Sequence, residues 1–254
     1  MLTDISLGQY YPGNSFIHKL DPRTKILSSL AYIIAVFLAA ESISYAAVIG
    51  FLFVVIAFSR LPFILVLKSI KPLWIIILLT LWIHVFTGQG EVLWSWKYLI
   101  ITKEGLAMGI KMSLRLILLL MISSILTFTT SPIVLTDGIE AILKPFKKIG
   151  VPAHELAMMM TIALRFIPTL LEETDRIMKA QSARGADFTS GNIVRRAKNM
   201  LPILVPLFIS AFRRADELAV AMEARCYRGG EGRTRMHELV YQQRDMMAAC
   251  GVAA

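Results

Sequence analysis

The segments ILSSLAYIIAVFLAA (26–40) and ISYAAVIGFLFVVIAF (43–58) contain no charged residue and are separated only by Glu41 and Ser42. Each uncharged core is somewhat shorter than the ~20 residues that a helix needs to cross a bilayer, so flanking polar residues must extend each helix. A connection of this length leaves room for little more than a turn. We therefore predict a tight helical hairpin within a membrane.

Two more apolar runs follow in the same half of the chain. They are LWIIILLTLWIHVF (73–86) and a stretch within 105–130 whose uncharged centre is LILLLMISSILTF. The chain of 254 residues is 56% hydrophobic and only 18% charged, which is more apolar than an ordinary soluble domain. The sequence predicts an all-α protein of the cell membrane with four amino-terminal spans.

The distribution of Lys and Arg indicates the orientation of these spans. Three such residues precede the first span, none lies between the first and the second, and three follow the second: Lys19, Arg23, Lys25, Arg60, Lys68 and Lys71. Because short cytoplasmic loops are enriched in positive charge, we predict a cytoplasmic amino terminus. The polar lead lacks a small-residue cleavage site, so we expect no removed signal peptide.

The motif DPRTK (21–25) marks the beginning of the first helix. Asp21 is suited to cap the helix and Pro22 is suited to its first turn. Arg23 and Lys25 are expected at the membrane interface. The motif therefore predicts a helix that begins at the cytoplasmic boundary.

Beyond Thr130 the pattern becomes amphipathic. Residues 131–150 predict a helix at the membrane surface, and long helical patterns follow at 152–184 and 193–225. The first long helix carries ionisable residues that oppose simple membrane crossing, and the apolar centre of the second, LPILVPLFISAF (201–212), is too short to cross. We expect these two helices to pack on each other in the cytoplasm.

These patterns divide the chain into three regions. We expect a transmembrane region at 1–130, a cytoplasmic or interfacial coupling-helix region at 131–228, and a linker with the start of a further membrane helix at 229–254. That helix is expected to contain the apolar run MMAACGVAA (246–254), so the chain is expected to end within it.

The two long helices end in related sequences, KAQSARGADF (179–188) and VAMEARCYRG (220–229). At an offset of 41 positions Arg184 matches Arg225, and an aspartate stands nine residues before each arginine. An arginine at a helix carboxyl end can simply complement the helix dipole. Two matched ends favour docking instead, because the neighbouring alanines permit close approach and each guanidinium offers a planar fork for a carboxylate.

Several sequence elements occur together along the chain: the twin ends ARG (183–185) and ARC (224–226), the DPRTK motif (21–25), the elbow of RLPF (60–63) and KPLW (71–74), and the closing EARCYRGGEGRTR (223–235). Their combination resembles the transmembrane T component of energy-coupling factor (ECF) transporters, the CbiQ/EcfT-like family. The resemblance covers nearly the whole chain. It implies a subunit that joins two cytoplasmic ABC-type ATPases to a small membrane protein, which binds a vitamin or a metal ion.

The resemblance also implies roles for individual residues. In the family, one arginine motif seats in a groove on each ATPase. The matching residues here are Ala183, Arg184 and Gly185 in the first motif and Ala224, Arg225 and Cys226 in the second. Cys226 departs from the strict Ala-Arg-Gly form, which leaves the backbone geometry at that end open.

The first long helix contains three consecutive methionines, Met158, Met159 and Met160, with Phe166 further along it. Flexible thioethers suit a surface that repacks against moving or exchangeable partners, although core filling is the ordinary role of a single methionine. In the resembled family the long coupling helices hold the substrate-binding subunit. We therefore expect these four residues at that interface.

The sequence contains no catalytic or nucleotide-binding signature. It has no G-x-x-x-x-G-K-[ST] loop, and no Ser-His-Asp, Cys-His or paired-carboxylate constellation is visible. Cys226 and Cys250 have no spacing typical of a metal site or of a disulfide framework. We expect a non-enzymatic subunit without cofactor or metal, with the bilayer and protein subunits but no nucleic acid as partners, and with energy supplied by another chain.

Two other classes of protein remain open. A proton-coupled secondary transporter needs carboxylates near the middle of the membrane, and the four apolar cores contain no Asp or Glu. A membrane-embedded lipid enzyme would need acidic residues to hold a metal, and no clustered Asp motif lies at a membrane boundary.

His84, Lys111 and Arg115 lie within or near the spans, where they can snorkel, bond between helices or line a substrate path. The cargo is not encoded here, although the closing motif favours a vitamin system over a dedicated cobalt or nickel system.

Overall fold

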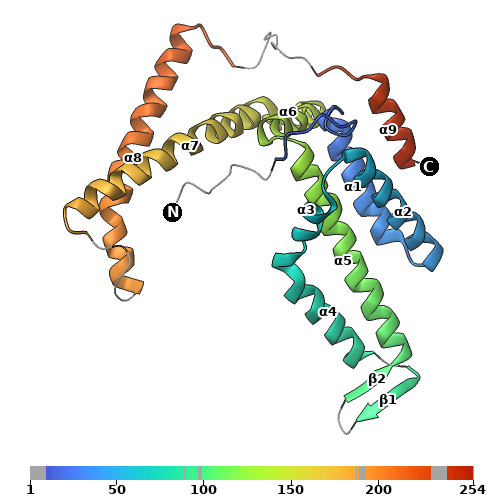
Figure 1. Ribbon diagram of the computed structural model, residues 1–254. Helices are drawn as coiled ribbons and strands as arrows, with labels where there is room; N and C mark the ends of the chain where they lie inside the picture. The colour runs from blue at the N-terminus through green and yellow to red at the C-terminus, as the bar shows by residue number, and fades with distance from the viewer. Residues whose placement is uncertain are drawn as a thin grey trace. The chain divides into compact units, whose positions relative to one another are not determined.

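The computed structural model describes residues 10–88, 90–96, 99–186, 188, 193–229 and 239–253. Their regular secondary structure is helical apart from one short hairpin, which confirms the predicted class of helical membrane protein (Figure 1). The helices are α1 (Pro22–Leu38), α2 (Ser42–Ser59), α3 (Phe63–Lys68), η1 (Lys71–Leu73), α4 (Trp74–Thr87), α5 (Lys103–Thr129), α6 (Pro132–Leu143), η2 (Lys144–Ile149), α7 (Ala153–Ala183), α8 (Ile193–Ala224) and α9 (Gln243–Ala253).

The chain forms two compact units; it passes from one to the other inside α6, between Gly138 and Ile139, and returns to the first at Leu239. One unit contains α1 to α5 together with α9, and we call it the membrane unit. The other contains α7 and α8, and we call it the long-helix unit. The carboxyl-terminal helix therefore packs with the first helix of the chain, more than 200 positions away in sequence.

Among the described residues, four helical stretches are long and apolar enough to cross a membrane: Ser42–Ser59, Phe63–Thr87, Lys103–Thr129 and Ala153–Ala183. The first three correspond to predicted spans, and the second of them begins earlier than the predicted run. The predicted first span forms α1, whose 17 residues extend about 25 Å, slightly less than a typical hydrocarbon core. The fourth stretch is α7, which qualifies by length and composition.

The first helical hairpin forms as predicted. Asp21 is the N-cap of α1, and its carboxylate accepts a hydrogen bond from the Arg23 amide at 2.8 Å. Helix α2 begins at Ser42, after a turn of three residues. The Tyr32 hydroxyl donates a hydrogen bond to the Val48 carbonyl at 3.2 Å, which ties the two helices together.

The core of the membrane unit lies where α5 meets α1, α2 and α3. Val36 and Val66 are completely buried there, and Leu52 and Leu118 are each 2% exposed. The outward faces keep large apolar side chains exposed, such as Trp74, Trp82 and Phe53. An apolar outer face of this kind is stable in lipid but not in water. Because the buried residues gather around α5, this helix lies at the centre of the membrane unit.

The loop between α4 and α5 contains a two-stranded antiparallel hairpin that the sequence did not lead us to expect. Its strands are β1 (Val92–Trp96) and β2 (Leu99–Thr102). Thr102 then caps α5, because its hydroxyl accepts a hydrogen bond from the Gly105 amide at 3.2 Å. The hairpin continues the α4–α5 pair beyond the ends of both helices (Figure 1).

The membrane unit gives Lys111 and Arg115 a definite role. Lys111 donates a hydrogen bond to the Ala40 carbonyl at 3.2 Å, and Arg115 donates one to the Ala39 carbonyl at 3.2 Å. The Arg115 guanidinium also lies over the Phe37 ring, 5.5 Å from its centre. Both cations therefore satisfy carbonyl groups at the end of α1, where the negative end of the helix dipole favours positive charge.

Candidate docking surface on the two long helices

Helices α7 and α8 pack against each other, as the sequence predicts (Figure 1). Their ends lie within one residue of the predicted ranges. An ion pair joins them, since Arg214 Nη2 lies 3.4 Å from Glu173 Oε2. Arg214 stands 41 positions after Glu173, which is the same offset that relates the two arginine ends. The two helices therefore contact each other at equivalent positions.

This contact places the two helix ends at equal distances from the ion pair. Arg184 lies 11 residues beyond Glu173, and Arg225 lies 11 residues beyond Arg214. At 1.5 Å per residue, each arginine lies about 16 Å along its helix from the ion pair. The long-helix unit thus presents two matched arms.

The first arm ends in a Schellman-type cap. The Gly185 amide donates to the Ser182 carbonyl and the Ala186 amide donates to the Gln181 carbonyl, each at 3.0 Å. Gly185 has a φ of +86°, the left-handed conformation with which glycine commonly ends a helix.

The second arm ends with the same backbone geometry although it lacks the glycine. The Cys226 amide donates to the Glu223 carbonyl at 2.9 Å, and the Tyr227 amide donates to the Met222 carbonyl at 3.0 Å. Cys226 has a φ of +58°, so the cysteine adopts the left-handed conformation that Gly185 adopts in the first arm. The departure from Ala-Arg-Gly therefore leaves the shape of the helix end unchanged.

The residues predicted for docking are accessible. Ala183, Arg184 and Gly185 are exposed, as are Ala224, Arg225 and Cys226. Within the described part of the chain, neither arginine side chain has a hydrogen-bond or ion-pair partner. Lys179 is paired instead with Asp175 one turn before it, at 2.6 Å. Both guanidinium groups are thus available for a partner protein.

The structure distributes the four predicted contact residues of α7 over more than one face. Met159 and Met160 are about half exposed, at 54% and 52%. Met158 and Phe166 are partly buried. Since residues seven apart share a helix face, Met159 and Phe166 lie on one side of α7.

Helix α8 carries a larger apolar surface that the sequence reasoning did not assign to a partner. Its members recur at three- and four-residue steps and are all between 43% and 68% exposed: Leu201, Leu204, Val205, Phe208, Ile209 and Phe212. This spacing puts them on one face of the helix. The apolar run is too short to cross a membrane. Its helical periodicity is the feature of the sequence from which a docking face could have been predicted.

The described residues hold no cluster of three or more His, Cys, Asp or Glu side chains that could bind a metal ion. What they do present are several apolar helices long enough for a membrane and two long amphipathic arms with matched ends. This arrangement defines a multi-pass helical membrane protein with two exposed helix ends.

A family model described as CbiQ, cobalt transport protein, matches residues 13–237. The chain therefore belongs to the CbiQ family. It is 73% identical to the energy-coupling factor transporter transmembrane protein EcfT of Acidaminococcus fermentans, over 97% of this chain and 92% of the relative. Proteins of the same name from Clostridium kluyveri and Bacillus subtilis are 58% and 49% identical, over 98% and 96% of this chain and 93% of each relative.

Proposed function

We propose that this chain is the transmembrane energy-coupling subunit of an ECF-type importer. It links ATP hydrolysis by two cytoplasmic ATPases to the uptake of a vitamin or other micronutrient, which a separate membrane subunit captures. The observation that carries this proposal is the pair of helix ends, which share one backbone geometry and end in exposed arginines on arms of equal length. Two matched helix ends suit docking on two ATPase subunits.

Each arginine end docks on one ATPase. Arg184 and Arg225 present planar guanidinium groups that can bind a carboxylate through two parallel hydrogen bonds. Ala183 and Ala224 keep the surface beside each arginine small, and the left-handed residue turns the chain away from the helix end. These features leave each arginine projecting from the tip of its arm.

The substrate-binding subunit packs on the apolar faces of the long helices. Met159, Met160 and Phe166 contribute from α7, and Met158 is partly buried. The exposed row from Leu201 to Phe212 on α8 extends this surface. A continuous row of exposed apolar side chains marks a site of contact with protein or membrane. The subunit itself has no catalytic role in this proposal.

The amino terminus and both long helices lie on the cytoplasmic side. The excess of Lys and Arg before the first span and after the second supports this orientation. Helix α7 is long enough to cross a membrane, yet Arg165, Glu172 and Glu173 interrupt its apolar sequence. Buried charges of this kind are costly in lipid, which favours a position of α7 at the cytoplasmic surface.

Affinity purification of the tagged chain from gently solubilised membranes tests the function. We expect two ATPase subunits and a small membrane protein to copurify, and we expect substrate uptake by the reconstituted complex to require ATP. A chain that purifies alone and drives uptake with a proton gradient would identify a secondary transporter. A chain that purifies alone and modifies lipid would identify an enzyme.

A further inference from the structure

The two ends of α1 hold their cations in different ways. At its beginning, Lys25 is only 7% exposed and donates hydrogen bonds to the carbonyls of His18 and Thr129, at 3.1 and 3.0 Å. Asp245 is also buried there and accepts a hydrogen bond from the Asp21 amide at 2.8 Å. Lys25, which the sequence predicts at the membrane interface, is therefore surrounded by acceptors from this chain.

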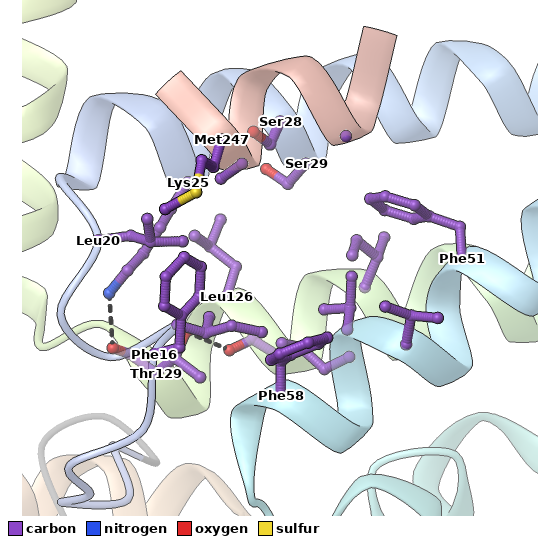
Figure 2. A pocket seen from close by; sticks show the side chains of 17 residues that line it. Phe16, Leu20, Lys25, Ser28, Ser29, Phe51, Phe58, Leu126, Thr129 and Met247 are labelled. Carbon is purple, nitrogen blue, oxygen red and sulfur yellow. Dashed lines mark hydrogen bonds between the residues drawn. The ribbon is translucent and has the colours of Figure 1, made fainter. Parts of the chain in front are cut away.

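The Lys25 ammonium group lies at the edge of an apolar cavity of about 460 Å³, which α1, α2, α5 and α9 line. Figure 2 shows its nitrogen bonded to Thr129 at that edge. A third hydrogen bond joins it to the Thr130 hydroxyl at 3.3 Å. Since an ammonium group has three N–H donors, Lys25 has none left for a ligand.

The other end of α1 meets two cations of α5 that keep unused donors. Lys111 uses one of its three N–H groups on the Ala40 carbonyl, and this contact is exposed. Arg115 bonds the Ala39 carbonyl through Nη2, whereas its Nη1 reaches only the Met112 sulfur, a weak acceptor, at 3.8 Å. Within the described part of the chain, neither cation has a carboxylate within ion-pair distance. This end of α1 therefore carries two positive charges that no ion pair balances.

The depth of these cations follows from the packing of α1 against α5. Arg115 and Lys111 stand 14 and 18 residues before Thr129 on α5, which corresponds to about 21 and 27 Å along the helix. A hydrocarbon core is about 30 Å thick. Because Thr129 lies at one end of the span, the two cations lie near the opposite boundary. Long basic side chains reach the lipid phosphate groups from such a position.

Exposed apolar side chains surround the two cations. Phe37, Leu38 and Ile43, at the α1–α2 turn, are 58%, 78% and 79% exposed. A lipid tail gains from covering such side chains, whereas a free phosphate ion does not. Glu41 lies in the same turn, is exposed, and opposes the binding of any anion. The surface thus combines two cations with an apolar rim and one unfavourable carboxylate.

We propose that Lys111, Arg115 and the α1–α2 turn bind the phosphate group of an anionic phospholipid, on the side of the membrane where α1 ends. The phosphate oxygens accept hydrogen bonds from the N–H groups that the α1 carbonyls do not use. The acyl chains lie against Leu38 and Ile43. This site does not depend on the proposed transport function, because it concerns only this chain and the bilayer.

Lipid binding by the purified chain in detergent tests the proposal. We expect dioleoyl phosphatidylglycerol to bind at least tenfold more tightly than dioleoyl phosphatidylcholine, as measured by native mass spectrometry and by the rise in melting temperature. The Lys111→Gln, Arg115→Gln double variant should bind phosphatidylglycerol at least tenfold more weakly. Its melting temperature without lipid should stay close to that of the unmodified chain, because glutamine still offers N–H donors to the α1 carbonyls.

A control variant and a variant of opposite sign sharpen this test. Lys103→Gln removes an exposed charge from the first turn of the same helix and should leave the affinity unchanged. Glu41→Gln removes the opposing carboxylate and should raise the affinity several-fold. This variant keeps the test decisive if the double variant fails to fold. Unchanged affinity in the double variant, or no rise in Glu41→Gln, would overturn the site.

Two further outcomes concern the nature of the ligand. Equal affinity for phosphatidylcholine would overturn the requirement for a negatively charged lipid. Inorganic phosphate, added without lipid, should leave the melting temperature unchanged, because it cannot cover the apolar rim. An equal rise with inorganic phosphate would indicate a site for free anions and would contradict a lipid site.

Discussion

Single residues at the two helix ends carry the proposed docking. Arg184 and Arg225 are exposed at the tips of matched arms, and small residues flank both of them. An arginine that merely complements a helix dipole contributes ~0.3 to 1 kcal/mol. An arginine that pairs with a carboxylate inside a protein groove contributes much more, so substitution distinguishes the two roles.

Truncation of the arginines is the first prediction. Arg184→Ala or Arg225→Ala should weaken ATPase binding by about 2 to 5 kcal/mol at that site, because the carboxylate of the partner is left without the guanidinium that binds it. Each single variant should retain some assembly through the other arm, and the double variant should lose most of it. Lysine should restore function only in part. Copurified ATPase and ATP-dependent uptake measure these effects.

The matched control is Arg213→Ala, which removes an exposed arginine from the middle of α8. It should leave assembly and uptake near normal. Normal uptake in the Arg184→Ala, Arg225→Ala double variant would show that both arginines only complement the helix dipole and do not dock the ATPases.

The backbone at Cys226 gives a second prediction. A left-handed conformation costs an ordinary L-residue roughly 1 to 2 kcal/mol, and a β-branched residue tolerates it poorly. Cys226→Gly should therefore retain ATPase copurification at raised salt or increase it slightly. Cys226→Val should reduce it. Equal behaviour of the two variants would show that this backbone geometry does not matter for docking.

At the scale of elements, α4 and α5 approach closely where glycine faces a neighbouring backbone. A Cβ atom on Gly105 would lie 2.9 Å from the His84 carbonyl oxygen, which is closer than packed atoms allow. Gly50 on α2 has open space around the equivalent position. The two glycines therefore differ in what a methyl group would meet.

This contrast gives a third prediction. Gly105→Ala should destabilise the membrane unit by about 1 to 3 kcal/mol, because helix backbones must move apart. Gly50→Ala should be neutral or slightly stabilising, since alanine favours the helix. Thermal unfolding of the two variants in detergent can be compared by measuring how much of the monodisperse size-exclusion peak remains after heating. A stable Gly105→Ala variant would argue against close α4–α5 packing.

The apolar face of α7 gives a fourth prediction. Replacing Met158, Met159 and Met160 together with Val keeps the surface apolar but stiffens it. The variant should capture less substrate-binding subunit while it retains its ATPases, as measured by the ratio of copurified subunits. Equal loss of both partners would indicate that the methionines are ordinary packing residues.

At the scale of the whole molecule, orientation in the membrane is open to direct test. The segment TSGNIVRR (189–196) and the chain after Arg228 carry polar and basic residues between or after the long arms. We predict that trypsin cuts these two segments in inside-out vesicles and leaves them intact in right-side-out vesicles. Cleavage only from the outer face would reverse the proposed topology.

The sequence by itself determined the class of the protein and the local structure of its parts. Apolar runs free of charge predicted the membrane helices, and the Asp21–Pro22 pair predicted where α1 begins. The repeated Ala-Arg ends indicated the residues that are proposed for docking. These features depend on hydrophobic periodicity and capping, which act over a few residues and can be recognised without knowing the fold.

Tertiary structure alone decided which distant groups meet. Asp245 packs against Asp21, Lys25 reaches the end of α5, and Arg115 reaches the end of α1. The sequence predicts Lys25 at the membrane interface, and it does not show which groups surround the side chain there. Its burial is stable because carbonyls and carboxylates from other parts of the chain replace that water, and pairings between groups so far apart in sequence follow no local pattern.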